Sequence, residues 1–118
     1  MAAVDLTNVT LHFNESADYP TLQKATDQTD GIRVDYTRKT DGNILLILEN
    51  GGSSPITANL LAGNGLQGVA DMPIEIANGK SVLLVVESGK FVNVSGENKG
   101  YLIINGSTDL KAAAIELP

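Results

Sequence analysis

Residues 87–118 read ESGKFVNVSGENKGYLIINGSTDLKAAAIELP, and this stretch sets the pattern for the whole chain. Three short apolar segments, Phe91–Val94, Tyr101–Ile104 and Leu110–Leu117, are separated by turn residues rich in Gly, Asn and Ser. Apolar and β-branched segments of about four to eight residues between such turns are typical of β-strands. The sequence therefore predicts short strands joined by tight turns.

The same pattern continues upstream, where a polar stretch from Asn14 to Asp30 is expected to be a loop. The candidate strands there are 9–13, 32–36, 44–48, 56–61, 73–76 and 82–86. In 32–36, apolar residues alternate with polar ones, the period of two expected of a half-buried strand. By contrast, 44–48 and 82–86 are wholly apolar, so we expect both of these strands to be buried on both faces.

Eight or nine such strands at short intervals predict an all-β protein. We expect a single antiparallel β-sandwich with jelly-roll or immunoglobulin-like topology. The chain has 118 residues, of which 42% are hydrophobic, and this is enough for one domain with its own core. We therefore expect residues 1–118 to form one domain, in which residues 1–30 could serve as an N-terminal contact arm.

Charge and cysteine content narrow the classes of partner. The net charge is −6, and the basic residues are scattered, which disfavours nucleic acid because binding of phosphates needs clustered Lys and Arg. The chain has no Cys, so packing and hydrogen bonds must hold the fold. No basic start followed by an apolar stretch, and no apolar run of about 20 residues, is present. We expect synthesis in the cytoplasm and no membrane partner.

Candidate catalytic and cofactor-binding residues are few, and we expect neither an enzyme nor a bound cofactor. His12 is the only His in the sequence. A hydrolytic triad or a zinc site needs further catalytic or metal-binding side chains close to such a His. The motif Gly63-Asn-Gly-Leu-Gln-Gly68 has the spacing of a dinucleotide-binding loop, but Pro73 and a strand pattern follow it instead of a helix. Residues 27–30 carry two Asp side chains in a loop, and such residues are common in turns without calcium.

Three motifs resemble a known family: Ala62-Gly-Asn-Gly-Leu-Gln-Gly68, Glu87-Ser-Gly-Lys-Phe91 and Ala112-Ala-Ala-Ile-Glu-Leu-Pro118. Together they make residues 44–118 similar to the small β-rich capsid decoration proteins of tailed bacteriophages, also called cement or head auxiliary proteins. The resemblance implies a structural virion protein that stabilises the capsid by bridging subunits of the major capsid protein. It also implies synthesis in the bacterial host, location on the outer capsid surface, and a homo-oligomer, with a trimer favoured over a dimer.

Physical clues suggest which residues would make the contacts. The first candidates are four spaced apolar residues of the polar N-terminal region: Val4, Leu6, Tyr19 and Leu22. An ordinary edge strand followed by a loop explains these residues about as well. A second candidate is the loop that carries Asn64, Leu66 and Gln67. Its Leu66, flanked by glycines, is expected either in the core or against a neighbouring subunit.

Two other classes of function remain open. A phage head fibre or host-glycan-binding module would use an exposed aromatic residue or a calcium-bearing loop, for which Tyr19 and residues 27–30 are the candidates. A small enzyme would bring His12 together with carboxylates from distant strands.

Overall fold

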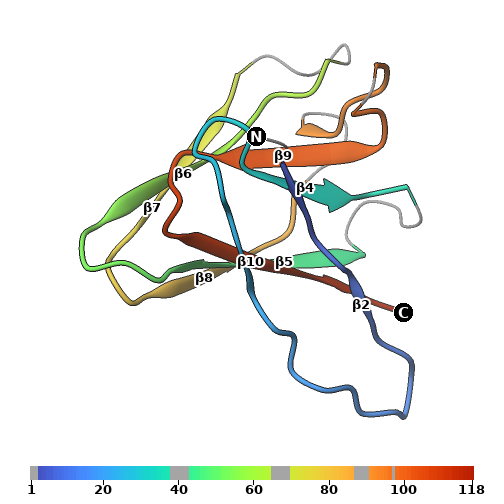
Figure 1. The fold of residues 1–118 in the computed structure, drawn as a ribbon. Coiled ribbons are helices and arrows are strands. Elements are labelled where there is room, and N and C mark those ends of the chain that lie inside the picture. The colour runs from blue at the N-terminus through green and yellow to red at the C-terminus, as the bar shows by residue number, and fades with distance from the viewer. Residues whose placement is uncertain (1–2, 38–42, 65–69, 87–90, 97) are drawn as a thin grey trace.

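The computed structural model describes residues 3–37, 43–64, 70–86, 91–96 and 98–118 (Figure 1). These residues contain ten strands: β1 (Val4–Asp5), β2 (Val9–Thr10), β3 (Gln23–Lys24), β4 (Ile32–Asp35), β5 (Ile44–Asn50), β6 (Ile56–Leu60), β7 (Met72–Ile76), β8 (Ser81–Leu84), β9 (Tyr101–Asn105) and β10 (Leu110–Glu116). The prediction of an all-β protein is confirmed.

The strands form two sheets of five. The first sheet has the order β1-β4-β9-β6-β7, and the second has the order β2-β10-β5-β8, with β3 also paired to β10. Neighbouring strands are antiparallel except for the parallel pairs β1 with β4 and β2 with β10. Both sheets are therefore mixed, which corrects the prediction of a purely antiparallel sandwich. The sheets lie one above the other, which is compatible with a β-sandwich (Figure 1).

Alternation along the central strands produces the core between the sheets. In β4, Ile32 and Val34 are fully buried, while Arg33 and Asp35, which alternate with them, are half-exposed. In the second sheet, Leu46 and Leu48 of β5 are also fully buried. Complete burial of one such Ile or Leu side chain is worth about 1.5–3 kcal/mol, so this alternation orients each strand in its sheet.

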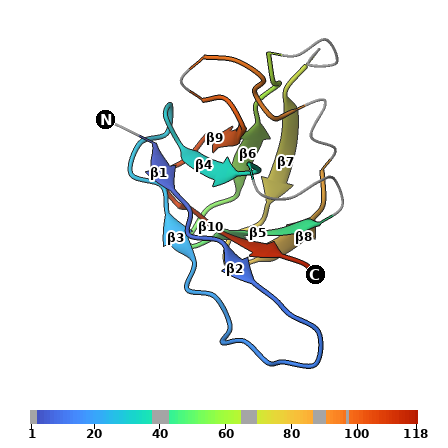
Figure 2. The same ribbon diagram turned by 90° about the vertical axis from the view of Figure 1, so that its right-hand side faces the viewer.

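The N-terminal segment runs along one edge of both sheets (Figure 2). The N–H of Val4 donates to the carbonyl oxygen of Gly31 at 2.9 Å, which joins β1 to the first sheet. Further on, Glu116 of β10, only 2% exposed, accepts hydrogen bonds from Asn8 Nδ2 at 2.9 Å and from Thr10 Oγ1 at 3.0 Å. The segment therefore connects an edge of the first sheet to an edge of the second.

The structure corrects several strand predictions. Phe91–Val94 is not a strand. The N–H of Asn93 donates to the carbonyl oxygen of Tyr101 at 3.1 Å, but the N–H of Val94 next to it donates to Oδ1 of Asn64 at 2.7 Å, and Phe91 and Val92 are buried. The strand expected over 9–13 ends at Thr10. The short strands β1 and β3 were not predicted, and each is held by pairing with a longer strand.

Candidate functional site

The most prominent surface feature is a loop of residues 11–22, which we call the contact loop. It connects β2 to β3 and extends past the second sheet on the side away from the first (Figures 1 and 2). Phe13 is 79% exposed and Tyr19 is 78% exposed. Loops of about 12 residues or more without secondary structure are uncommon in compact domains and are often functional.

The base of the contact loop is held firmly. On one side, the N–H of Leu11 donates to the carbonyl oxygen of Glu116 at 2.8 Å, and β2 pairs with β10 just before it. On the other side, β3 pairs with β10, and the side chain of Gln23 accepts from the N–H of Thr7 at 2.8 Å and donates to the carbonyl oxygen of Asp5 at 3.1 Å. The loop therefore presents its two aromatic side chains from a fixed base.

Beside the contact loop, the outer face of the second sheet is apolar. Strand register places Ala113, Ile47 and Leu83 in one row across β10, β5 and β8. A second row contains Val9, Ile115 and Leu45, from β2, β10 and β5. All these residues alternate with inward-facing core residues, so their side chains lie on the outside of the sheet. We call these two rows, together with Val85 just beyond β8, the outer strip.

The outer strip is apolar but only partly covered. Ile47 and Ala113 are each 4% exposed, whereas Leu83 is 66% and Val85 is 51% exposed. A polar row borders the strip: Lys24, Lys111, Glu49 and Ser81, in register across four strands. An exposed apolar patch with a polar rim is characteristic of interaction surfaces. The prediction that 82–86 is buried on both faces is wrong, because β8 lies at the sheet edge.

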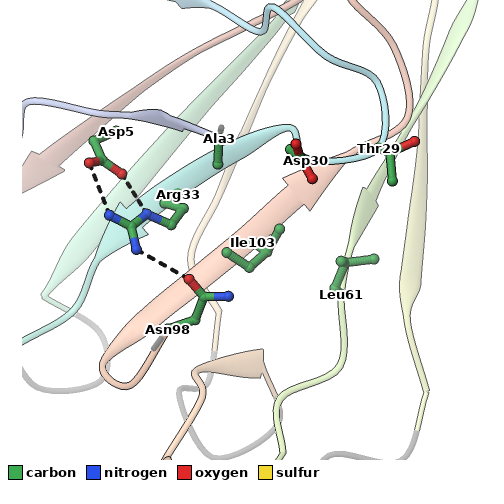
Figure 3. A pocket seen from close by; sticks show the side chains of 8 residues that line it. All are labelled: Ala3, Asp5, Thr29, Asp30, Arg33, Leu61, Asn98 and Ile103. Atoms are coloured by element: carbon green, nitrogen blue, oxygen red, sulfur yellow. Dashed lines mark hydrogen bonds and ion pairs between the residues drawn. The ribbon is translucent and has the colours of Figure 1, made fainter. Parts of the chain in front are cut away.

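A shallow depression of about 500 Å³ lies on the outer face of the first sheet (Figure 3). Leu61 and Ile103 contribute apolar surface to it, and Thr29 and Asp30 lie at its rim. The depression combines an apolar floor with polar groups, which is the general composition of a small-molecule site.

An ion pair forms one wall of the depression. Arg33 donates to both carboxylate oxygens of Asp5, from Nε at 2.5 Å and from Nη2 at 3.0 Å, and from Nη1 to Oδ1 of Asn98 at 3.2 Å (Figure 3). Its guanidinium carbon lies 4.3 Å from the centre of the Tyr101 ring. The hydrogen bond from Arg33 lowers the pKa of the Asp5 carboxyl group, and the charge of Arg33 adds to this effect.

The candidate calcium loop is organised as a turn. Oδ1 of Asp27 accepts hydrogen bonds from the backbone N–H groups of Asp30 at 2.9 Å and Thr29 at 2.7 Å, and these bonds lower the pKa of Asp27. This is the usual role of Asp in a turn. Within the described residues, no group of three or more His, Asp or Glu side chains is placed to hold a metal ion.

The N-terminal contact candidates lie in different environments. Val4 and Leu22 are half-buried, in β1 and just before β3. Leu6 is 6% exposed and belongs to the core, so its side chain is not offered to a partner in this structure. Only Tyr19 is strongly exposed. Phe13, Leu83 and Val85 were missed, because alternation and apolar runs suggested burial for them.

The second group of candidates is described only in part. Asn64 is exposed, and both ends of its side chain bond within the chain: Oδ1 accepts from the N–H of Val94 and Nδ2 donates to the carbonyl oxygen of Ser95 at 3.0 Å. Asn64 thus fixes the 93–95 segment. Leu66 and Gln67 lie outside the described residues.

In the described ranges, no helix is long and apolar enough to cross a membrane. No known protein family, curated protein or solved structure matches this chain.

Proposed function

We propose that this protein is a structural virion protein that decorates the outer surface of a tailed-phage capsid and bridges subunits of the major capsid protein. The observation that carries this proposal is the contact loop, with Phe13 and Tyr19 almost fully exposed next to an apolar sheet face. Exposed aromatic residues on a fixed base are well suited to anchor a protein in a pocket of its partner.

Attachment through this surface would gain from repetition. Burial of one Phe side chain contributes about 1.5–3 kcal/mol, so one loop alone gives only modest affinity. Several linked copies on neighbouring capsid subunits raise the total retention far above that of one copy. The homo-oligomer expected from the resemblance therefore fits this mode of binding.

We also propose that the sandwich is a jelly roll. We number the eight strands from β3 to β10 as 1 to 8. In this numbering the second sheet has the order 1-8-3-6, and the first sheet has the order 2-7-4-5. These are the strand orders of a jelly roll, an architecture common in viral capsid and lectin domains. The strand order supports this topology over an immunoglobulin-like one.

The test is binding to phage heads that lack the protein. Purified protein is titrated onto expanded heads and unexpanded shells of the parent phage, and the bound fraction is measured by cosedimentation. We expect saturation at a fixed ratio to capsid subunits, with expanded heads preferred. Absence of binding to either shell would refute the proposal.

Variants then test whether the contact loop is the binding element. The double variant Phe13→Ser, Tyr19→Ser should lose at least about tenfold in affinity for heads, or about 1.4 kcal/mol. Val94→Ser is the matched control, since Val94 is also apolar and 56% exposed but lies far from the loop in sequence. Unchanged binding by the double variant would exclude the contact loop as the anchor.

The alternative function is a phage head-fibre or host-glycan-binding module, and the depression on the first sheet favours it. The apolar floor at Leu61 and Ile103 would take the ring face of a sugar, and the amide of Asn98 would bond its hydroxyl groups. NMR titration with host surface glycans, without heads, tests this function. Shifts confined to the depression and abolished by Asn98→Ala would favour glycan binding.

A further inference from the structure

Strand β8 lies at the end of the second sheet. In the described part of the chain it pairs with β5 and with no other strand (Figure 1). The N–H of Asn50 donates to the carbonyl oxygen of Lys80 at 3.0 Å, which fixes the alternation of hydrogen-bonded pairs along β5 and β8. The backbone N–H and C=O groups of Ser81 and Leu83 therefore point away from β5, toward the free edge.

The edge of β8 lacks two of the features that normally prevent pairing, charged residues and proline, although Gly79 and Lys80 just before it both bond to Asn50 in a bulge. Residues 81–86 read SVLLVV and contain no charge and no proline. Leu83 and Val85 are largely exposed beside this edge. Natural sheets usually protect an edge with charged residues, proline or a bulge.

The opposite sheet provides an internal comparison. Its edge strand β7 carries Pro73, which has no N–H to donate, and the exposed charge of Glu75. Strand β1, at the other edge of that sheet, carries the exposed Asp5. Residues 81–86 thus contain neither the charge nor the proline found at the edges of the first sheet.

We propose that β8 pairs antiparallel with β8 of a second copy of this chain, about a two-fold axis perpendicular to the sheet. A second copy fits because the segment is complementary to itself: outward residues meet outward residues, and inward residues meet inward ones. Since residues 81–86 are uncharged, the pairing brings no like charges together, although each chain carries −6.

Two alignments of the paired β8 strands satisfy the backbone N–H and C=O groups that point away from β5. With the axis at Leu83, this residue faces its own copy across the interface. With the axis at Leu84, Leu83 of each chain faces Val85 of the other. Both alignments keep the outer faces of the two sheets on the same side, so the two outer strips join into one surface.

In this dimer the two outer strips would form one surface, with one contact loop at each of the two ends farthest from the β8 pair. This consequence rests on the proposed function, since it doubles the surface offered to the capsid. The pairing of β8 itself does not depend on it. A test in the absence of heads therefore separates the two proposals.

The first measurement is the mass of the protein in solution by sedimentation equilibrium across the micromolar range. We expect twice the chain mass. Leu83→Lys places two like charges at the interface and should weaken dimerisation by at least about tenfold. Val94→Lys introduces the same charge at another exposed apolar position and should leave the mass unchanged. A monomer at every concentration, or a trimer, would overturn the proposal.

Disulfide trapping locates the contact independently. Because the chain has no Cys, any disulfide formed by a single-Cys variant joins two molecules. With the axis at Leu83, Leu83→Cys should cross-link with itself. With the axis at Leu84, a mixture of Leu83→Cys and Val85→Cys should cross-link faster than either variant alone. Thr57→Cys, exposed on the first sheet, is the control, and rates equal to the control rate in every case would contradict edge pairing.

Discussion

Ile47 and Leu83 face each other across the β5 and β8 pair, yet Ile47 is 4% exposed and Leu83 is 66% exposed. Both side chains lie on the outer face of the same sheet, and their difference comes from position. Among the described strands, Ile47 has a neighbour on both sides, whereas Leu83 has a neighbour on one side. The outer strip is therefore buried at its centre, around Ile47, and exposed to solvent at its edge, around Leu83.

This difference predicts unequal costs for truncation of the two side chains. Ile47→Ala should lower the free energy of unfolding by about 2–4 kcal/mol, because it removes buried methyl groups and leaves a cavity. Leu83→Ala should change it by less than about 0.5 kcal/mol in the monomer, since little burial is lost. Urea denaturation, followed at a concentration too low for dimers, measures both. Equal costs would show that Leu83 is covered.

Gly31 and Gly79 form a matched pair for testing backbone constraints. Both have positive φ, +63° and +72° respectively. A Cβ on Gly31 would lie 2.1 Å from the carbonyl oxygen of Ile104, whereas a Cβ on Gly79 would meet nothing within 4 Å. Gly79→Ala should therefore cost only the conformational strain, about 1–2 kcal/mol, and Gly31→Ala clearly more. Thermal denaturation of both variants compares them, and similar losses would contradict the close approach.

The pair of Asp5 and Arg33 should contribute a pH-dependent increment of stability. Arg33 holds the pKa of Asp5 below its ordinary value of 3.8, so the contribution is present above that value and is lost as pH falls through the lower folded-state pKa. The Asp5 side chain is 60% exposed, and solvent screening limits the contribution to at most about 1 kcal/mol.

Asp5→Asn removes this contribution. At neutral pH the variant should be less stable than the wild type by up to about 1 kcal/mol, and the difference should shrink as the pH falls below 3.8 and the Asp5 carboxyl group becomes protonated. Denaturation curves at a series of pH values from neutral downwards provide the measurement. A difference that persists at low pH would assign the effect to something other than the charge.

Asn50 is a buried polar residue whose loss should be costly. It is 0% exposed, its Nδ2 donates to the carbonyl oxygens of Ser54 at 2.7 Å and Ile76 at 3.0 Å, and its Oδ1 accepts from the N–H of Gly52 at 2.8 Å. Asn50→Ala leaves these groups without their partner and should destabilise the protein by about 2–4 kcal/mol. Asn78→Ala, at an exposed position, is the control for urea denaturation. A loss below 1 kcal/mol, roughly that of one hydrogen bond, would indicate that water replaces the amide.

Local pattern predicted the central strands well. The alternation in 32–36 and the apolar run in 44–48 correspond to β4 and β5, because residues in the middle of a sheet obey the period of two directly. The same reasoning failed for Phe91–Val94, where Val94 bonds to the side chain of Asn64. Nothing in the local sequence identifies this long-range partner.

The contact loop and the outer strip were less predictable from the sequence than the core. The exposure of Tyr19 followed from its polar surroundings, whereas Phe13 was assigned to a strand that ends before it. Leu83 and Val85 belong to a run that resembles a central strand, and only the strand order places β8 at the edge. Sequence pattern reports how apolar a strand is, but its position in the sheet depends on pairing with residues far along the chain.

Strand β10 follows the other nine in sequence, yet it lies inside the second sheet and pairs with β2, β3 and β5. The contacts of Glu116 with Asn8 and Thr10 span 108 and 106 residues. During translation, the second sheet therefore cannot form until β10 has left the ribosome, and such distant pairing slows folding. Nascent chains should meanwhile expose the apolar segments of β5 and β8, which makes chaperone binding during synthesis a direct consequence of the strand order.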